Sequence, residues 1–197
     1  MQNNLYTQKD FTHLLGLAGF SDTMITNHLT LYAGYVTNAN KVIGLLDTVE
    51  KGGYEYGELK RRLGWEVNGI KLHEMYFENM CNQNSGQKES SSFENNEKIK
   101  SEILEAYGSF DEYKSSLKRN GMTRGIGWVL LIKDNDTNKV FHTWVGEHNV
   151  GNIINAKILM VMDCWEHAYI TDYGIKRADY IESFTNAIDW KIVESRL

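Results

Sequence analysis

Two long stretches with helical periodicity, separated by a pair of glycines, constrain the fold of this chain more than any other feature. Residues 22–51 place apolar side chains at the spacing of one helix face, without a strong breaker inside the run. Gly52 and Gly53 interrupt the pattern, and a second helix is predicted over 56–80, either continuous or broken near Gly64. The sequence therefore predicts an antiparallel helical hairpin with a tight glycine turn.

The residues ahead of the hairpin predict one further short helix and a defined helix start. Residues 10–15 have the form of a short capped helix that Gly19 ends. Phe20 and Ser21 then supply an apolar residue and an N-cap for the long helix.

The second half of the chain begins with a polar run and changes to strand periodicity. Residues 82–96 are rich in Asn, Ser, Gln and Glu and predict a linker. Helices are predicted over 97–107 and 110–119, strands over 127–133, 140–147 and 158–162, and helices again over 165–173 and 178–186. The predicted fold class is α+β: an N-terminal α-helical hairpin (1–87), then a C-terminal domain (88–197) with a three-stranded antiparallel sheet flanked by helices.

Composition excludes several classes of function. A chain of 197 residues with a net charge of −5 and no Lys/Arg run is not expected to bind nucleic acid. No stretch of about 18 apolar residues occurs, and the polar first residues lack the apolar core of a signal peptide, so we expect neither membrane span nor export. A cytoplasmic location follows, in which Cys81 and Cys164 stay free thiols.

Asp163 and His167 form the pair that carries chemistry. A carboxylate and an imidazole four residues apart can lie on one helix face, or bracket a strand-to-helix turn, and so reach one metal ion. The pair alone fits a surface ion pair equally well. Its context consists of Trp165, Glu166, Ala168, Tyr169, Tyr173, Arg177, Asp179, Tyr180 and the run 186–190. Together these residues resemble the C-terminal signature of the iron/manganese superoxide dismutases.

The resemblance extends to two histidines of the hairpin. His73 and the residues around it resemble the second-ligand helix of archaeal-type members, although a histidine packed between helices is the alternative. In the family the first ligand stands eight residues before a tyrosine, which here is Tyr35, and that position is Asn27. On a regular helix i+7 returns to within about 20° of its start, so His28 shares a face with Tyr35. We take His28 as the ligand; a site without it, with Asn27 in that position, is the alternative.

Around the ligands, the resemblance implies further roles. Gly69 cannot supply the polar group that many members place four residues before the second ligand, so His148 is expected to link Tyr35 to bound solvent. Trp128 and Trp165 resemble the aromatic wall that excludes water. An exposed loop histidine and ordinary core tryptophans are the alternatives.

The resemblance also implies an assembly, with some departures. Glu166 resembles the residue that bonds the ligand histidine of a second subunit, and with Tyr169 it predicts the interface of a homodimer, or of a tetramer. The family's basic, histidine-rich segment is replaced by residues 29–32, and its second tyrosine by Ile170. Both ends of the relay across the interface are thus missing, and Tyr32 is expected to occupy the gateway instead.

The activity that the resemblance implies is disproportionation of superoxide to oxygen and hydrogen peroxide. It uses one Fe or Mn ion per subunit, held by three histidines, one aspartate and a solvent molecule, and nitrogen-plus-carboxylate ligation suits both metals. Two alternatives are kept. His73, Asp163 and His167 without His28 would form a non-haem iron oxygenase-like site. A catalytically silent metal-binding scaffold is the other.

Overall fold

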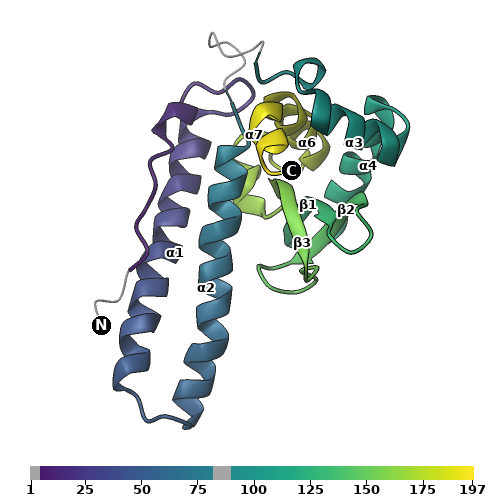
Figure 1. The fold of residues 1–197 in the computed structure, drawn as a ribbon. Helices are drawn as coiled ribbons and strands as arrows, with labels where there is room; N and C mark the ends of the chain where they lie inside the picture. The colour runs from purple at the N-terminus through teal and green to yellow at the C-terminus, as the bar shows by residue number, and fades with distance from the viewer. Residues whose placement is uncertain (1–4, 82–89) are drawn as a thin grey trace.

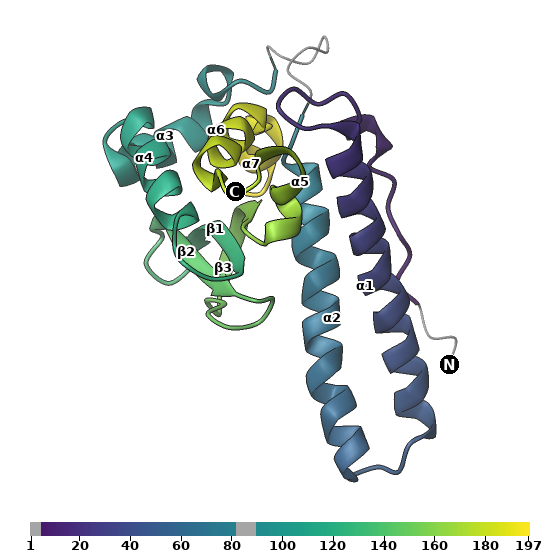
Figure 2. The same cartoon turned by 180° about the vertical axis from the view of Figure 1, so that it is seen from behind.

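The helical hairpin forms as predicted, with one correction. The computed structural model describes residues 5–81 and 90–197, in which α1 spans Asp22–Thr48 and α2 spans Tyr54–Glu78 (Figure 1). The predicted break at Gly64 is wrong: α2 runs through it, since this glycine is exposed and its loss of helix propensity, about 1 kcal/mol, is spread over a long packed helix. The turn end of the hairpin projects away from the rest of the molecule (Figures 1 and 2).

The helix predicted over 10–15 is only a single 3-10 turn, η1, at Thr12–Leu14. Asp10 accepts a hydrogen bond from the Thr12 backbone N–H, and Gly16 has a φ of 78°, so the segment turns at both ends. A segment this short forms too few hydrogen bonds to offset the free-energy cost of nucleating an α-helix. Ser21 is the N-cap of α1, as predicted, and its side chain accepts from the Met24 N–H.

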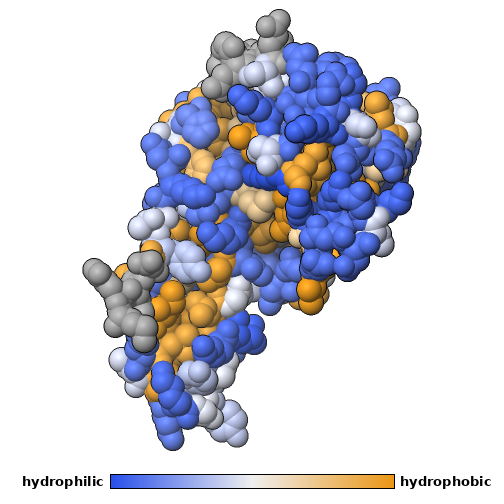
Figure 3. Space-filling model, in the orientation of Figure 1, coloured by the Kyte–Doolittle hydropathy of each residue, from blue (hydrophilic) through white to orange (hydrophobic). Residues whose placement is uncertain are grey.

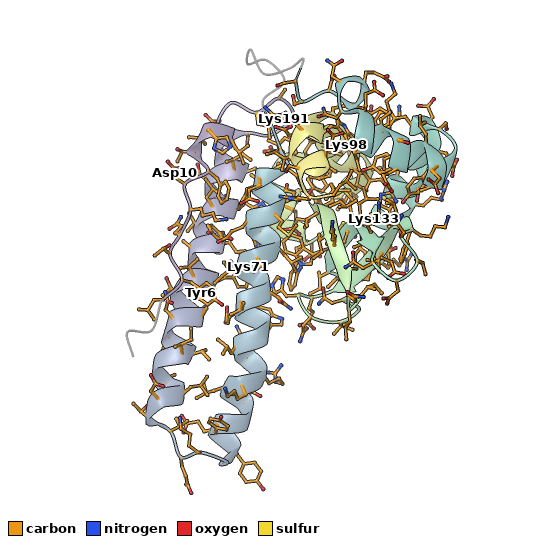
Figure 4. The ribbon with its side chains drawn as sticks, viewed as in Figure 1. Tyr6, Asp10, Lys71, Lys98, Lys133 and Lys191 are labelled. Carbon is orange, nitrogen blue, oxygen red and sulfur yellow. The ribbon has the colours of Figure 1, made fainter. Side chains whose placement is uncertain are left out.

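The segment before η1 lies along the hairpin. The backbone N–H of Tyr6 donates to Asn40 Oδ1 (2.9 Å), and Asn40 Nδ2 donates to the Tyr6 carbonyl (2.8 Å). Lys71 lies over the Tyr6 ring, with Nζ 5.6 Å from its centroid (Figure 4). The Lys9 backbone N–H donates to the Tyr32 hydroxyl. The N-terminal segment is therefore held against both helices.

The C-terminal part is a three-stranded antiparallel sheet with helices around it, which confirms the predicted fold class. Its helical elements are η2 (Phe93–Asn95), α3 (Glu97–Tyr107), α4 (Phe110–Gly121), η3 (Glu166–Ala168), α5 (Ile170–Tyr173), α6 (Arg177–Ala187) and α7 (Trp190–Ser195). The strands are β1 (Gly127–Asp134), β2 (Val140–Gly146) and β3 (Ala156–Asp163), in the order β2-β1-β3.

Three predictions for this part need comment. The helix expected over 165–173 is divided into η3 and α5, and α7 was not predicted at all. Of the predicted linker, residues 82–89 lie outside the described residues, and η2 occupies part of the remainder. The domain boundary at 87/88 stays a proposal.

The two parts pack through a shared apolar core. Buried residues of α1, α2 and the sheet belong to one hydrophobic cluster. Strand β3 contacts α2, and η3 and α5, which follow β3, contact α1. On the face seen in Figure 3, apolar surface gathers over the projecting half of the hairpin, while the C-terminal part is mostly polar. Across residues 5–81 and 90–197, no helix is both long enough and apolar enough to span a membrane.

Candidate metal centre

Four side chains from four different elements converge where the hairpin meets the sheet. They are His28 of α1, His73 of α2, Asp163 at the end of β3 and His167 in η3. One ligand atom from each lies within 4.8 Å of every other. Asp163 and His73 are completely buried and His28 is 2% exposed. The cluster predicted from sequence therefore comes together in space.

The helical phase of α1 brings His28 into this cluster. The structure describes every residue of α1, and all of them are α-helical without a π-bulge. His28 and Tyr35, seven residues apart, consequently face the same buried side. Asn27 is exposed, which leaves it turned away from the cluster.

The strand-to-helix turn after β3 aims the Asp163 carboxylate. Its Oδ1 accepts from the Trp165 backbone N–H (2.8 Å), which leaves Oδ2 facing the imidazoles. His28 Nε2 and His167 Nε2 each lie 3.1 Å from Oδ2. The Asp163 and His167 side chains thus bracket the turn, one of the two arrangements that their spacing allowed.

His73 is held as the tautomer that a metal ligand requires. Its Nδ1 lies 2.6 Å from the Gly69 carbonyl oxygen, to which it can only donate, so Nε2 carries the lone pair. Nε2 lies 3.8 Å from Asp163 Oδ2 and has no hydrogen-bond partner among the described residues. Burial keeps the pKa of His73 well below its usual value, which maintains the neutral form.

The donor set fits a single metal ion. Bonds of about 2.0–2.2 Å to nitrogen and oxygen place adjacent donors about 3–4 Å apart, and the distances from Asp163 Oδ2 range from 3.1 to 3.8 Å. Burial alone raises the pKa of the Asp163 carboxyl, but His167 and His28 outweigh it and hold the pKa below its usual range. Burial lowers the pKa of His28. One anionic donor and the two neutral donors His28 and His73 result, and His73 Nε2 has no hydrogen-bond partner in the described residues.

A hydrogen-bonded chain of three side chains adjoins the cluster. Burial lowers the pKa of His148 to about 4, so its imidazole is neutral near pH 7. Trp128 Nε1 donates to His148 Nδ1 (3.0 Å), and His148 Nε2 must therefore carry the proton that it shares with the Tyr35 hydroxyl (2.9 Å). The Tyr35 oxygen accepts this bond and keeps its own proton available. Burial also raises the pKa of Tyr35.

Two tryptophans form the walls. Trp128 is completely buried, and its ring centroid lies 4.9 Å from that of His73. Trp165 is half-buried and stacks on His148, with centroids 5.0 Å apart and planes 20° apart. Both rings exclude water from the space between the hairpin and the sheet, as an apolar wall around a metal site would.

Three α2 residues around the site were not singled out as contacts by the sequence. A Cβ on Gly69 would lie 2.6 Å from the Tyr35 ring, so that ring packs directly on the α2 backbone. Asn68 Nδ2 donates to the His148 carbonyl (2.9 Å), and Trp65 Nε1 donates to Glu147 Oε2 (3.0 Å). The local sequence pattern does not predict these contacts, because the partners of Gly69, Asn68 and Trp65 are far away along the chain.

One sequence expectation about access is wrong. Tyr32 does not line an entrance: it is completely buried, and its hydroxyl donates to Glu74 Oε1 (3.0 Å). It packs beneath the N-terminal segment because i+4 from His28 points toward η1 and α2. Ile170 and Glu166 are exposed, whereas Tyr169 is only 9% exposed.

The fold and the site define a class of protein: an α+β chain whose helical hairpin and sheet share a cluster of three histidines and one aspartate. The family model described as "Iron/manganese superoxide dismutases, C-terminal domain" matches residues 95–196. The chain belongs to the iron/manganese superoxide dismutase family.

Relatives match most of the chain. "Superoxide dismutase [Fe]" of Methanothermobacter marburgensis is 34% identical, over 86% of this chain and 83% of the relative. "Superoxide dismutase [Fe]" of Aquifex pyrophilus is 31% identical, over 95% and 89% respectively. "Superoxide dismutase [Mn] 2" of Haloferax volcanii is 28% identical, over 86% and 83%. Relatives with either metal in their names therefore resemble this chain.

Proposed function

We propose that this protein is a superoxide dismutase, in which His28, His73, Asp163 and His167 hold one Fe or Mn ion. The observation that carries the proposal is the convergence of these donors, with His73 Nε2 left as a buried lone pair facing the others. Family membership and relatives with iron and manganese in their names support both the activity and the metals.

The reaction converts two superoxide anions and two protons to oxygen and hydrogen peroxide. When bound, the metal supplies a centre that alternates between trivalent and divalent states, taking an electron from one superoxide and giving it to the next. The protein's own task is to supply protons and to limit access. One superoxide loses a single electron and becomes oxygen, and the other gains that electron together with two protons and becomes hydrogen peroxide.

Tyr35 is the group that we propose to hold a proton for this reaction. Its oxygen accepts from His148 Nε2, so its hydroxyl proton is free to point toward a bound anion. Because burial raises its pKa, the phenol stays protonated across the physiological range. Trp128 keeps His148 in the required tautomer through Nδ1. Trp128 and Trp165 exclude bulk water and larger molecules.

The alternative functions receive less support. An oxygenase-like site would leave His28 outside the cluster, yet its Nε2 lies 3.1 Å from the Asp163 carboxylate. A silent scaffold would not need the Tyr35–His148 hydrogen bond beside the donors.

The test loads wild type, His28→Ala and Asn27→Ala separately with Fe and with Mn. We expect metal content and superoxide consumption to be lost in His28→Ala and kept in Asn27→Ala, because Asn27 is exposed. The comparison of the two metals names the working ion. A wild type that binds metal but consumes no superoxide with either ion would contradict the proposed activity, and full activity of His28→Ala would contradict the ligand set.

We also propose a homodimer, with a tetramer as the larger alternative. Glu166 is exposed beside His167, and Ile170 and Ile175 are 54% and 98% exposed, a mixture of charge and apolar surface that suits an interface. Tyr169 is only 9% exposed and would contribute a small part of its side chain to this interface. Light scattering of wild type and Glu166→Ala tests this: a wild-type monomer at micromolar concentration would contradict it.

A cytoplasmic location is proposed as well, supported by two buried cysteines, Cys81 and Cys164, that are not joined in a disulfide. Fractionation of the producing cells tests the location. Recovery of the protein mainly outside the cytoplasm would contradict it.

A further inference from the structure

The loop that carries His148 depends on distant contacts for its position. His148 lies in a turn that is closed by the bridge between Gly146 and Val150. The residue before it, Glu147, has a left-handed φ of 49°. A left-handed backbone at a residue other than glycine costs about 1 kcal/mol or more, so the turn needs compensating contacts. Glu147 obtains one through its backbone N–H, which donates to the Ile126 carbonyl (3.1 Å).

Two α2 side chains provide further contacts, beside the longer hydrogen bond that Asn152 Nδ2 donates to the His148 carbonyl (3.5 Å). Trp65 Nε1 donates to Glu147 Oε2 (3.0 Å), and Asn68 Nδ2 donates to the His148 carbonyl (2.9 Å). Trp65 and Asn68 are three residues apart on one helix, so they present neighbouring donors to consecutive loop residues. The structure assigns Trp65 and Asn68 as positioning residues that hold His148 against Tyr35, an inference that rests on the proposed dismutase function.

The Trp65 ring also supports the imidazole directly. Its centroid lies 4.5 Å from that of His148 and 5.5 Å from that of Tyr35, so it covers both partners of their hydrogen bond. On the other side, the Arg62 guanidinium lies 4.1 Å from the Trp65 centroid and pairs with Glu66. The ring is therefore fixed between a cation and the loop.

His148 requires this support because its ring makes only two polar contacts with the described part of the chain. Trp128 reaches Nδ1 from β1 and Tyr35 reaches Nε2 from α1, so the imidazole bridges the sheet and the hairpin. A shift of the loop by a fraction of an ångström weakens both bonds together. The contacts from α2 to the Glu147 side chain and to the His148 carbonyl therefore fix the position in which the imidazole meets the Tyr35 hydroxyl.

The indole N–H of Trp128 provides a probe of this arrangement. Trp128 is completely buried, and its N–H is bonded to His148 Nδ1, so the proton exchanges with solvent only when the loop opens. The measurement uses the full chain loaded with zinc, a diamagnetic ion that accepts nitrogen and oxygen ligands. Indole exchange is followed by ¹H–¹⁵N NMR, with Trp128→Phe to assign the resonance.

The variants are Trp65→Phe, which keeps a ring but removes the donor, and Asn68→Ala. The matched control is Asn40→Ala, which likewise removes an amide that binds the backbone of a distant segment, at Tyr6. We expect exchange of the Trp128 N–H to accelerate about threefold to tenfold in both α2 variants, the factor that one hydrogen bond supports. The control should leave it unchanged.

Three results would overturn the inference. One is unchanged exchange in both α2 variants. Another is equal acceleration in all three variants, which would indicate general loosening. With Fe or Mn bound, the α2 variants should lose about tenfold in dismutation, and wild-type rates in both would also overturn it. An inactive wild type would instead remove the proposed function, while the exchange rates would still decide whether α2 holds the loop.

Discussion

His73 and His142 are two imidazoles in different regions of one molecule, His73 completely buried and His142 partly buried, and their ring nitrogens have similar local contacts. Each has a partner on Nδ1: the Gly69 carbonyl for His73, and the Tyr107 and Ser116 hydroxyls, at 2.9 and 3.0 Å, for His142. Each leaves Nε2 without a partner among the described residues. Burial lowers both pKa values, that of His142 to about 3.

The surroundings of the free nitrogen separate them. His73 Nε2 faces the Asp163 carboxylate and two further imidazoles. His142 packs against the rings of Tyr107 and Tyr113, and no carboxylate joins it in a metal-binding cluster within the described residues. A histidine with a buried ring nitrogen that lacks a partner is therefore not enough for a metal site. Convergence of such nitrogens on an anionic oxygen is what makes one.

The largest effect should follow removal of that anion. Asp163→Asn keeps the shape of the side chain but removes the charge, and we expect metal affinity to fall by more than about 100-fold, beyond the loss typical of outer-shell changes. His142→Gln should leave affinity within about threefold of wild type. Competition with a chelator measures both, and a similar loss in the two variants would remove the distinction between the sites.

Metal binding should stabilise the fold through the cluster that contains His28 and not through the region around His142. At free metal about 100 times the dissociation constant, wild type should gain about 2.7 kcal/mol against unfolding, since the ion binds the folded chain. His28→Ala should gain almost nothing, and His142→Gln should gain as much as wild type. Thermal unfolding with and without metal provides the measurement. A metal-dependent gain that survives in His28→Ala would show that another set of donors is used.

Trp128→Phe should have a smaller effect. The change keeps most of the ring but removes the donor to His148 Nδ1, so the His148 tautomer is no longer fixed toward Tyr35. We expect about a tenfold loss of dismutation with metal content unchanged. Steady-state superoxide consumption, normalised to bound metal, is the readout, and a wild-type rate would show that the tautomer is fixed by other means.

The smallest effect concerns pH and His142. Its pKa of about 3 in the folded chain lies below the usual histidine value of 6.5, so the unfolded chain takes up a proton first as the pH falls. The imidazole thus contributes stability that is complete above pH 6.5 and is lost toward pH 3, by about 1.4 kcal/mol for each pH unit.

His142→Gln should accordingly lose less stability than wild type between pH 6.5 and 5.5. Urea unfolding of the metal-free proteins at both values measures the difference, with pH 7.5 as the reference at which the two should be parallel. Identical slopes throughout the acidic range would mean that His142 is protonated in the folded state.

Several predictions from the local sequence pattern were wrong, because packing against distant parts of the chain decided the structure there. Gly64 resembled a helix breaker, yet α2 passes through it because neighbouring turns are held by packing against α1. Residues 165–173 resembled one helix, yet the turn after β3 must first aim Asp163 and His167 at the same point, so η3 precedes α5. Tyr32 resembled a gateway residue until its buried contacts with Glu74 placed it elsewhere.

The sequence by itself determined the helix phase that puts His28 and Tyr35 on one face, the Asp163–His167 pair, the α+β order of elements and the family. These follow from periodicity and short-range spacing, which a chain carries locally. Only the tertiary structure decided that four donors meet, which tautomer His148 adopts, and that α2 holds its loop. Those outcomes depend on which helix and sheet faces pack together, between residues that can be more than a hundred positions apart in the sequence. A local sequence pattern does not specify such long-range contacts.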